Sequence, residues 1–141
     1  MYKRGLNDNV IELFDIEYDR ATDSITFPVR DKSGRVLFVA RRSVSSKRFD
    51  IPKGVEKPLY GLHEVYLFSM QQIARLSPNR LVGVPEVYVV EGLFDCLRLW
   101  CNNIPAVAGF GCLFSDYQIK QLNELPTRHL ILATDNDKAG I

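Results

Sequence analysis

The stretch VYVVEGLFDCLRLWCNNIPAVAGFG, residues 87–111, decides the fold. It begins with a short run of apolar, largely β-branched residues, which is typical of a strand buried on both faces of a sheet. A segment with helical periodicity follows and ends at two asparagines, and a second apolar run comes directly after it. Because a strand, a helix and a strand at this spacing form a right-handed crossover between parallel strands, the stretch predicts a βαβ unit.

The same alternation continues toward the C-terminus and extends the unit to βαβαβ. SDYQIKQLNEL, residues 115–125, is predicted to be a helix in which Ser115 and Gln118 form a capping box. HLILATDND, residues 129–137, is expected to be a third buried strand. A parallel sheet needs cover on both faces, and the chain stops on this strand, so we expect it to be part of a longer protein.

Residues 1–60 have a different pattern, which predicts a mixed α/β subdomain. A short helix is expected after Asn7 or Asp8, either of which can cap it. Residues 24–42 resemble a β-hairpin around the turn DKSG. Proline cannot donate a hydrogen bond to a sheet, so Pro28 predicts that the first strand of this hairpin lies at an edge.

The predicted organisation therefore has three parts, and the fold class is α/β. The N-terminal subdomain, residues 1–60, ends in a basic loop that begins near residue 43. Residues 61–84 form a connecting helix and loop. Residues 85–141 form the parallel βαβαβ sheet with its helices.

Charge is unevenly distributed along the 141 residues, although the formal net charge is only +1. From Arg30 to Lys57 the net charge is +6, whereas from Glu86 to the end it is −3. Such an asymmetry suits a protein that binds a polyanion with one half and metal cations with the other. Solvated surface charge of both signs explains the same counts equally well.

Cysteine and histidine usage favours a reduced, cytoplasmic protein that does not bind zinc. Cys96, Cys101 and Cys112 form no metal-binding spacing, and each lies in apolar sequence, so we expect reduced, buried thiols. The two histidines, His63 and His129, are too few for an ordinary zinc site. No signal peptide and no membrane-spanning run is present, so no membrane contact is expected.

Four carboxylates are candidates for a metal site. Glu91 follows the first strand of the βαβαβ unit, and Asp135 and Asp137 follow the third. The carboxyl ends of parallel strands meet at one edge of a sheet, and strand residues two apart point to the same side. Asp95 lies in the first turn of the intervening helix. Oxygen-only ligands favour Mg²⁺ or Mn²⁺, as in nucleotidyl transfer, although turn formation and helix capping also explain these acids.

These residues also carry a resemblance to a known family. VVEGLFD, GFGCLFSDYQIKQL and LATDNDKAG resemble the Toprim domain shared by primases, topoisomerases and some nucleases. YKRGLNDNVIELFDIEYD, ITFPVRDKSGRVLFVARR and KRFDIPKG before LYGL resemble the RNA polymerase domain of bacterial DnaG-type DNA primases. The resemblance covers essentially the whole chain, and its motifs occur in the family's order.

The resemblance implies a nucleotidyltransferase that joins ribonucleoside triphosphates into a short RNA primer on a single-stranded DNA template. It implies that Asp135 and Asp137 hold Mg²⁺, or Mn²⁺, with Asp95 in support. It implies that Glu91 holds a second ion or acts as a general acid or base. It also implies a replicative helicase as partner of the full-length protein.

The resemblance further implies that Arg4, Arg42 and Lys47 contact the template or the triphosphate. This implication agrees with the positive net charge from Arg30 to Lys57, since lysine and arginine contacts to phosphate dominate single-strand binding. Phe49 or Tyr60 is a candidate for stacking on a base.

By comparison with the family, we expect the zinc-binding module, the last part of the Toprim domain and the helicase-binding domain to be missing from this chain. Two other functions therefore stay open. One is a phosphodiester-cleaving Toprim enzyme of the nuclease or topoisomerase kind. The other is a non-catalytic module that binds single-stranded DNA.

Overall fold

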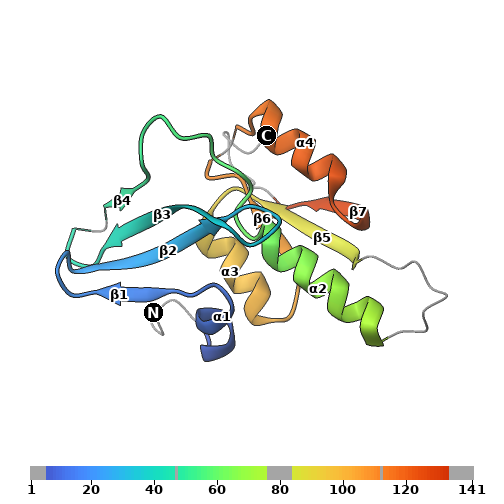
Figure 1. The fold of residues 1–141 in the computed structure, drawn as a ribbon, viewed down its shortest axis with the longest axis horizontal. Coiled ribbons are helices and arrows are strands. Elements are labelled where there is room, and N and C mark those ends of the chain that lie inside the picture. The colour runs from blue at the N-terminus through green and yellow to red at the C-terminus, as the bar shows by residue number, and fades with distance from the viewer. Residues whose placement is uncertain (1–5, 47, 76–83, 112, 134–141) are drawn as a thin grey trace.

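The computed structural model describes residues 6–46, 48–75, 84–111 and 113–133, and it contains two sheets joined by helices (Figure 1). The first sheet is antiparallel with the strand order β1-β2-β3-β4, and the second is parallel with the order β6-β5-β7. This arrangement confirms the predicted fold class. The elements are α1 (Asp8–Leu13), β1 (Glu17–Asp19), β2 (Ser24–Arg30), β3 (Val36–Ser43), β4 (Phe49–Asp50), α2 (Leu62–Arg75), β5 (Val84–Val90), α3 (Leu93–Cys101), β6 (Ala106–Ala108), α4 (Asp116–Glu124) and β7 (Thr127–Leu132).

The antiparallel sheet is built around the predicted hairpin. Strands β2 and β3 pair directly, and the turn between them places Gly34 at φ +99°, a backbone conformation that glycine adopts without strain. The Asp31 carboxylate accepts hydrogen bonds from the backbone N–H groups of Ser33 and Arg35, which stabilises the turn. The hairpin prediction is confirmed.

Two predictions about this sheet are wrong. Strand β2 is not at an edge, because β1 pairs with its first residues, Ser24 to Thr26. Pro28 is tolerated there because β1 begins at Glu17, opposite Thr26, and does not extend alongside the proline. The basic segment after β3 is also not wholly a loop, since β4 pairs with Arg41 and Arg42.

The parallel sheet forms as the sequence predicts, and its helices begin and end at the predicted signals. Helix α3 ends with Asn102 at its C-cap, and α4 begins with a capping box between Ser115 and Gln118. Asn7 caps α1 by accepting a hydrogen bond from the Val10 N–H. The longest described helix, α2, has 14 residues, and no helix in the described part of the chain is long and apolar enough to cross a bilayer.

Strand β7 corrects one expectation. It pairs in parallel with β5 as predicted, but it is not buried, since Leu130 is 37% exposed and Leu132 is 70% exposed. Leu130 and Leu132 are two residues apart and point to the same face of the sheet, so that face is not covered at the end of β7, which is also an edge strand. An apolar run alone does not distinguish a buried central strand from such an edge strand.

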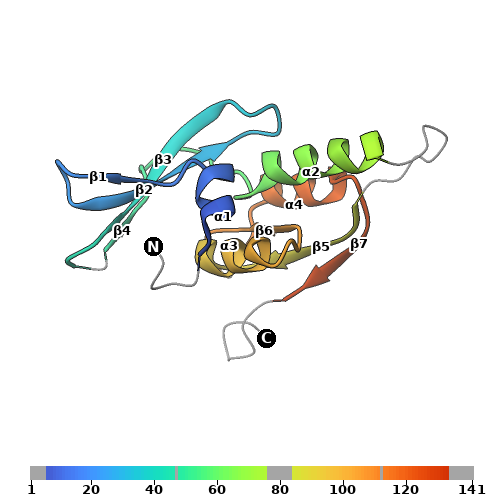
Figure 2. The ribbon, with the colours of Figure 1, turned by 90° about the horizontal axis from the view of Figure 1, so that it is seen from below.

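Residues Pro58–Tyr60, which we call the junction segment, connect the two sheets. The Tyr60 N–H donates to the Ala108 carbonyl at 2.8 Å, and the Ala108 N–H donates back at 2.9 Å. The Leu59 N–H donates to Gln121 Oε1 at 2.8 Å. The antiparallel sheet lies toward one end of the molecule and the parallel sheet with its helices toward the other (Figure 2). The junction segment therefore fixes how the two halves meet.

The hydrophobic core is continuous between the two halves. The ring of Phe14, next to α1, stacks on Tyr60 at 5.2 Å and meets the edge of Trp100 at 5.9 Å. Phe27 of β2 packs edge-on against Phe94 of α3 at 5.5 Å. Aromatic pairs at these separations add to the stabilisation from buried area, so the two sheets share one packed interior.

Cys96 is buried as predicted, whereas Cys101 is only partly buried. Cys96 and Cys101 carry free thiols, and burial raises the pKa of Cys96 well above its ordinary value, which disfavours the reactive thiolate. The His63 ring packs against Gly34, and its Nδ1 lies 3.2 Å from the Lys32 carbonyl. Cys112 lies outside the described residues.

Glu64 is an acid inside this core. It lies in the first turn of α2 and is only 5% exposed, and desolvation raises its pKa from 4.5 to about 7. A Glu64 carboxyl that stays protonated avoids the cost of a buried charge. The hydroxyl of Tyr60, which is also buried, has no hydrogen-bond partner among the described residues.

We predict that Glu64 makes stability fall as pH rises from about 4.5 to about 7. Over this range the unfolded chain releases the Glu64 proton while the folded chain keeps it, so unfolding becomes more favourable. Glu64→Gln should remove the decline and raise the free energy of unfolding at pH 8 by on the order of 3 kcal/mol. Urea denaturation across the pH range measures this. Glu12→Gln, at an exposed glutamate, is the control, and a Glu64→Gln profile parallel to the wild type would contradict the prediction.

Candidate active site

The candidate site lies at the carboxyl end of β5, where Glu91 directly follows the strand. Gly92 caps α3 in an extended conformation and turns the chain after Glu91. The Gly109 N–H donates to the Val90 carbonyl at 3.2 Å, and the Gly111 N–H donates to the Glu91 carbonyl at 3.1 Å. The loop after β6 is thereby tied to the end of β5, and the backbone of Glu91 is held on a rigid element.

Glu91 lines a pocket of about 430 Å³ that lies between the two sheets. One side comes from the end of β5 and from α3, and the other from β3, β4 and the residue after β4. The size is within the usual range for a small-molecule site. The lining residues that the argument uses are Arg42, Phe49, Glu91, Phe94, Asp95 and Phe110.

Asp95 lies beside Glu91 in this pocket. A side chain at Gly92 would meet Asp95 Oδ2 at 3.3 Å, so this carboxylate bends back over the turn that follows Glu91. Its other oxygen lies 3.6 Å from Arg98 Nη1, in an ion pair whose two side chains are each about half exposed. Asp95 also occupies the first turn of α3, where the helix dipole favours a carboxylate.

The other two predicted acids, Asp135 and Asp137, lie outside the described residues. Ala133, which precedes Asp135 by two residues, lies beside β5, because its N–H donates to the Val89 carbonyl at 2.9 Å. Among the described residues, no three His, Cys, Asp or Glu side chains converge as a metal site would require. Glu91 and Asp95 offer carboxylate oxygens to one partly open pocket, and such donors fit a hard divalent cation.

Arg42 shares the pocket with Glu91, whereas Arg41 does not line it. Neighbouring residues of a strand point to opposite faces of the sheet. The Arg42 guanidinium lies 5.1 Å from the centre of the Phe94 ring, a cation–π distance. Arg41 instead pairs with Asp19 at 2.8 Å. The other predicted basic residues, Arg4 and Lys47, lie outside the described residues.

The two aromatic candidates for base stacking have different surroundings. Tyr60 is 1% exposed within the core, so its prediction is wrong. Phe49 is 37% exposed and lines the pocket. Sequence reasoning missed Phe94 and Phe110 as pocket walls. Phe110 lies between two glycines and has φ +66°. The sequence Gly-Phe-Gly was therefore the available signal for an unusual loop at this position.

Comparison with known proteins first defines the class of the C-terminal half. Residues 88–141 match the family described as Toprim-like. The match begins within β5 and includes Glu91, the pocket residues of α3 and the loop after β6. The α/β class and the acidic strand end agree with this assignment.

Comparison of the whole chain then gives a more specific relationship than the C-terminal half alone. It is 34% identical to a DNA primase of Legionella pneumophila over 132 residues, which is 87% of this chain. The structure matches the Escherichia coli primase catalytic core with a TM-score of 0.72 and 25% identity, covering 99% of this chain and 55% of that one. It matches a DnaG primase catalytic domain bound to single-stranded DNA with a TM-score of 0.71 and 26% identity, covering 99% and 53%.

The chain is therefore a homologue of the catalytic core of DnaG-type DNA primases, and its C-terminal part is Toprim-like. It spans 21% of the length of the Legionella pneumophila primase. The relationship suggested by the motif order is confirmed by similarity over nearly all of the chain.

We predict that the loop after β6 tolerates no side chain at Gly109. A Cβ atom there would lie 2.1 Å from the Phe114 ring, and Gly109→Ala should lower the free energy of unfolding by about 1 to 3 kcal/mol. Gly92→Ala is the matched control in the same site, because its Cβ would meet only the movable Asp95 carboxylate at 3.3 Å. Equal losses for the two variants in urea denaturation would show that the loop is not tightly packed.

Proposed function

We propose that this chain is the catalytic segment of a DNA primase, a nucleotidyltransferase that joins ribonucleoside triphosphates on a single-stranded DNA template. The observation that carries the proposal is that Glu91 and Arg42, from two different sheets, line one pocket. A carboxylate that can hold a cation and a guanidinium that can hold a phosphate thus line the same pocket in a homologue of primases. The proposed parts are residues 1–60, the connection 61–84 and the Toprim-like domain 85–141.

The acidic side of the site is proposed to hold Mg²⁺ or Mn²⁺ through Glu91, Asp135 and Asp137, with Asp95 in support. The approach of Ala133 to Val89 supports this set, since Asp135 follows two residues later in the chain. A bound divalent cation lowers the cost of the negative charge that develops on the attacking and leaving oxygens. Glu91, at the end of a rigid strand, is proposed to hold a second ion or to act as a general acid or base.

The basic side of the site is proposed to bind the phosphates of the template or the triphosphate through Arg4, Arg42 and Lys47. The contact of Arg42 with Phe94 supports its part, because the ring holds the guanidinium at the pocket wall. Phe49, which is partly exposed beside it, is available to a base. A homologous DnaG primase catalytic domain is described as bound to single-stranded DNA, which agrees with this choice of template.

In the full-length protein we propose a replicative helicase as partner and the cytoplasm as location. A Toprim enzyme that cleaves phosphodiester bonds and a non-catalytic DNA-binding module are the competing functions. The first would degrade a labelled strand, and the second would bind it without chemistry. Both are therefore separable from primer synthesis in one assay.

We predict that Glu91→Gln separates catalysis from binding. Primer synthesis from labelled ribonucleotides on single-stranded DNA, with Mg²⁺ or Mn²⁺, should fall at least about a hundredfold, because the carboxylate acts on the reacting oxygens. Single-strand binding, measured by fluorescence anisotropy, should persist. Cleavage of the template in place of synthesis, or a Glu91→Gln variant with wild-type synthesis, would contradict the proposal.

We predict the complementary result for the basic side. Arg42→Ala should weaken single-strand or nucleotide binding by about tenfold, the value of one charge-assisted phosphate contact. Arg41→Ala removes the same charge from the neighbouring residue, whose partner is Asp19, and is the matched control. Equal losses for the two variants would show that only the total charge of the strand matters.

A further inference from the structure

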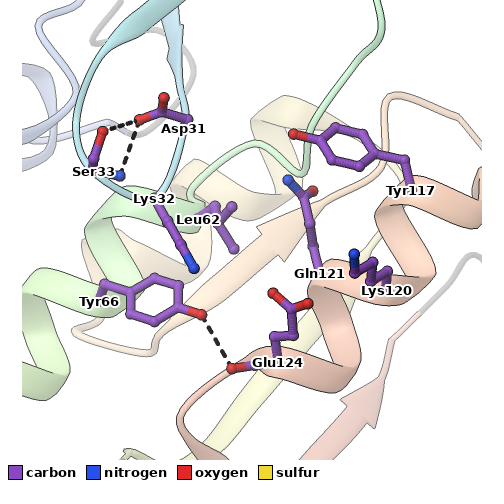
Figure 3. A pocket seen from close by; sticks show the side chains of 9 residues that line it. All are labelled: Asp31, Lys32, Ser33, Leu62, Tyr66, Tyr117, Lys120, Gln121 and Glu124. Atoms are coloured by element: carbon purple, nitrogen blue, oxygen red, sulfur yellow. Dashed lines mark hydrogen bonds between the residues drawn. The ribbon is translucent and has the colours of Figure 1, made fainter.

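A second pocket, of about 280 Å³, lies between the β2–β3 turn, α2 and α4 (Figure 3). It shares no lining residue with the candidate active site. We call it the α2–α4 pocket. The lining residues that carry the argument are Lys32, Tyr66, Tyr117, Lys120, Gln121 and Glu124.

Several hydrogen-bond acceptors around this pocket are engaged by the protein itself, and the Glu124 carboxylate is the main exception. The Asp31 carboxylate accepts from the Ser33 hydroxyl at 2.6 Å and lies 3.4 Å from the Arg35 guanidinium. Gln121 Oε1 accepts from the Leu59 N–H, and the Glu124 carbonyl accepts from the Tyr66 hydroxyl at 3.1 Å. Apart from the Glu124 carboxylate, a ligand that offers hydrogen-bond donors would therefore find few free acceptors among these groups.

The donors, in contrast, are left available. Gln121 is 8% exposed, and the bond from Leu59 engages its oxygen, so its amide nitrogen is the end left for a ligand. In the described part of the chain, no hydrogen bond or ion pair engages the ammonium groups of Lys32 and Lys120 or the hydroxyl of Tyr117. These donors come from the turn and from α4, and all of them line the same pocket (Figure 3).

We propose that the α2–α4 pocket binds a phosphate group carried by a nucleotide or by a nucleic-acid strand. Two ammonium groups, a buried amide and a phenol together match an acceptor-rich anion. The Glu124 carboxylate is the opposing charge at the pocket, since the charge of Asp31 is offset by Arg35. Glu124 therefore limits the affinity for an anion. Its removal should raise the affinity, whereas removal of a lysine should lower it.

The test is a titration of the ¹⁵N-labelled 141-residue chain with pyrophosphate, ATP or single-stranded oligo-dT in the absence of divalent metal. We expect the side-chain amide signals of Gln121 to shift. Lys32→Ala and Lys120→Ala should each weaken this binding by about tenfold. Glu124→Gln should strengthen it, because a repulsive charge is removed. Arg128→Ala removes an exposed positive charge outside the pocket and should leave the affinity unchanged.

The three probes distinguish the source of the phosphate. A shift with ATP and pyrophosphate alone supports a free nucleotide, whereas a shift with oligo-dT supports a strand that passes over α4. The proposal is overturned if none of the three probes shifts the Gln121 signals, or if Lys120→Ala binds every probe as the wild type does. Glu91→Gln should leave the Gln121 shifts intact, so failure here is distinguishable from failure of the proposed active site.

Discussion

The arrangement of the molecule depends on the pairing of the junction segment with the parallel sheet. Tyr60 exchanges two backbone hydrogen bonds with Ala108, at 2.8 and 2.9 Å. The buried side chains of Gln118 and Gln121 accompany this pairing, since they bond the Pro58 carbonyl and the Leu59 N–H. Each bond satisfies a polar group that would otherwise be costly to bury. The end of the N-terminal half is thereby fixed to the edge of the sheet that carries Glu91.

The candidate active site is a consequence of this docking. Glu91 belongs to one sheet and Arg42 to the other, so neither half contains the pocket alone. The shared aromatic core, in which Phe27 meets Phe94, holds the two walls at a fixed separation. Under the proposed function, a cation held by Glu91 and a phosphate held by Arg42 would come together only when both halves are packed together. The structural similarity to a primase catalytic core covers 99% of the chain and so includes both halves.

Local sequence signals predicted most elements correctly, whereas features set by long-range packing were missed. The caps of α1 and α4 could be predicted because Asn7 and Ser115 act on neighbouring backbone groups. The exposure of β7 and the burial of Tyr60 could not, because each depends on which elements lie alongside. Glu91, Asp95 and Arg42 were identifiable as candidates, but their common pocket follows from the docking of two sheets. Phe94 and Phe110 have no polar group that would have marked them as pocket walls.

The most direct test of the central claim is whether Glu91 helps to hold a divalent cation at the end of β5. Mn²⁺ broadens NMR signals near its binding site, so a titration of the ¹⁵N-labelled chain reports the position of the ion. The account predicts selective broadening of the Gly92 and Gly111 amide signals, with Gly34 in the distant hairpin turn unaffected, and loss of that selectivity in Glu91→Gln. Broadening that spares Gly92 and Gly111, or that persists unchanged in Glu91→Gln, would contradict the account.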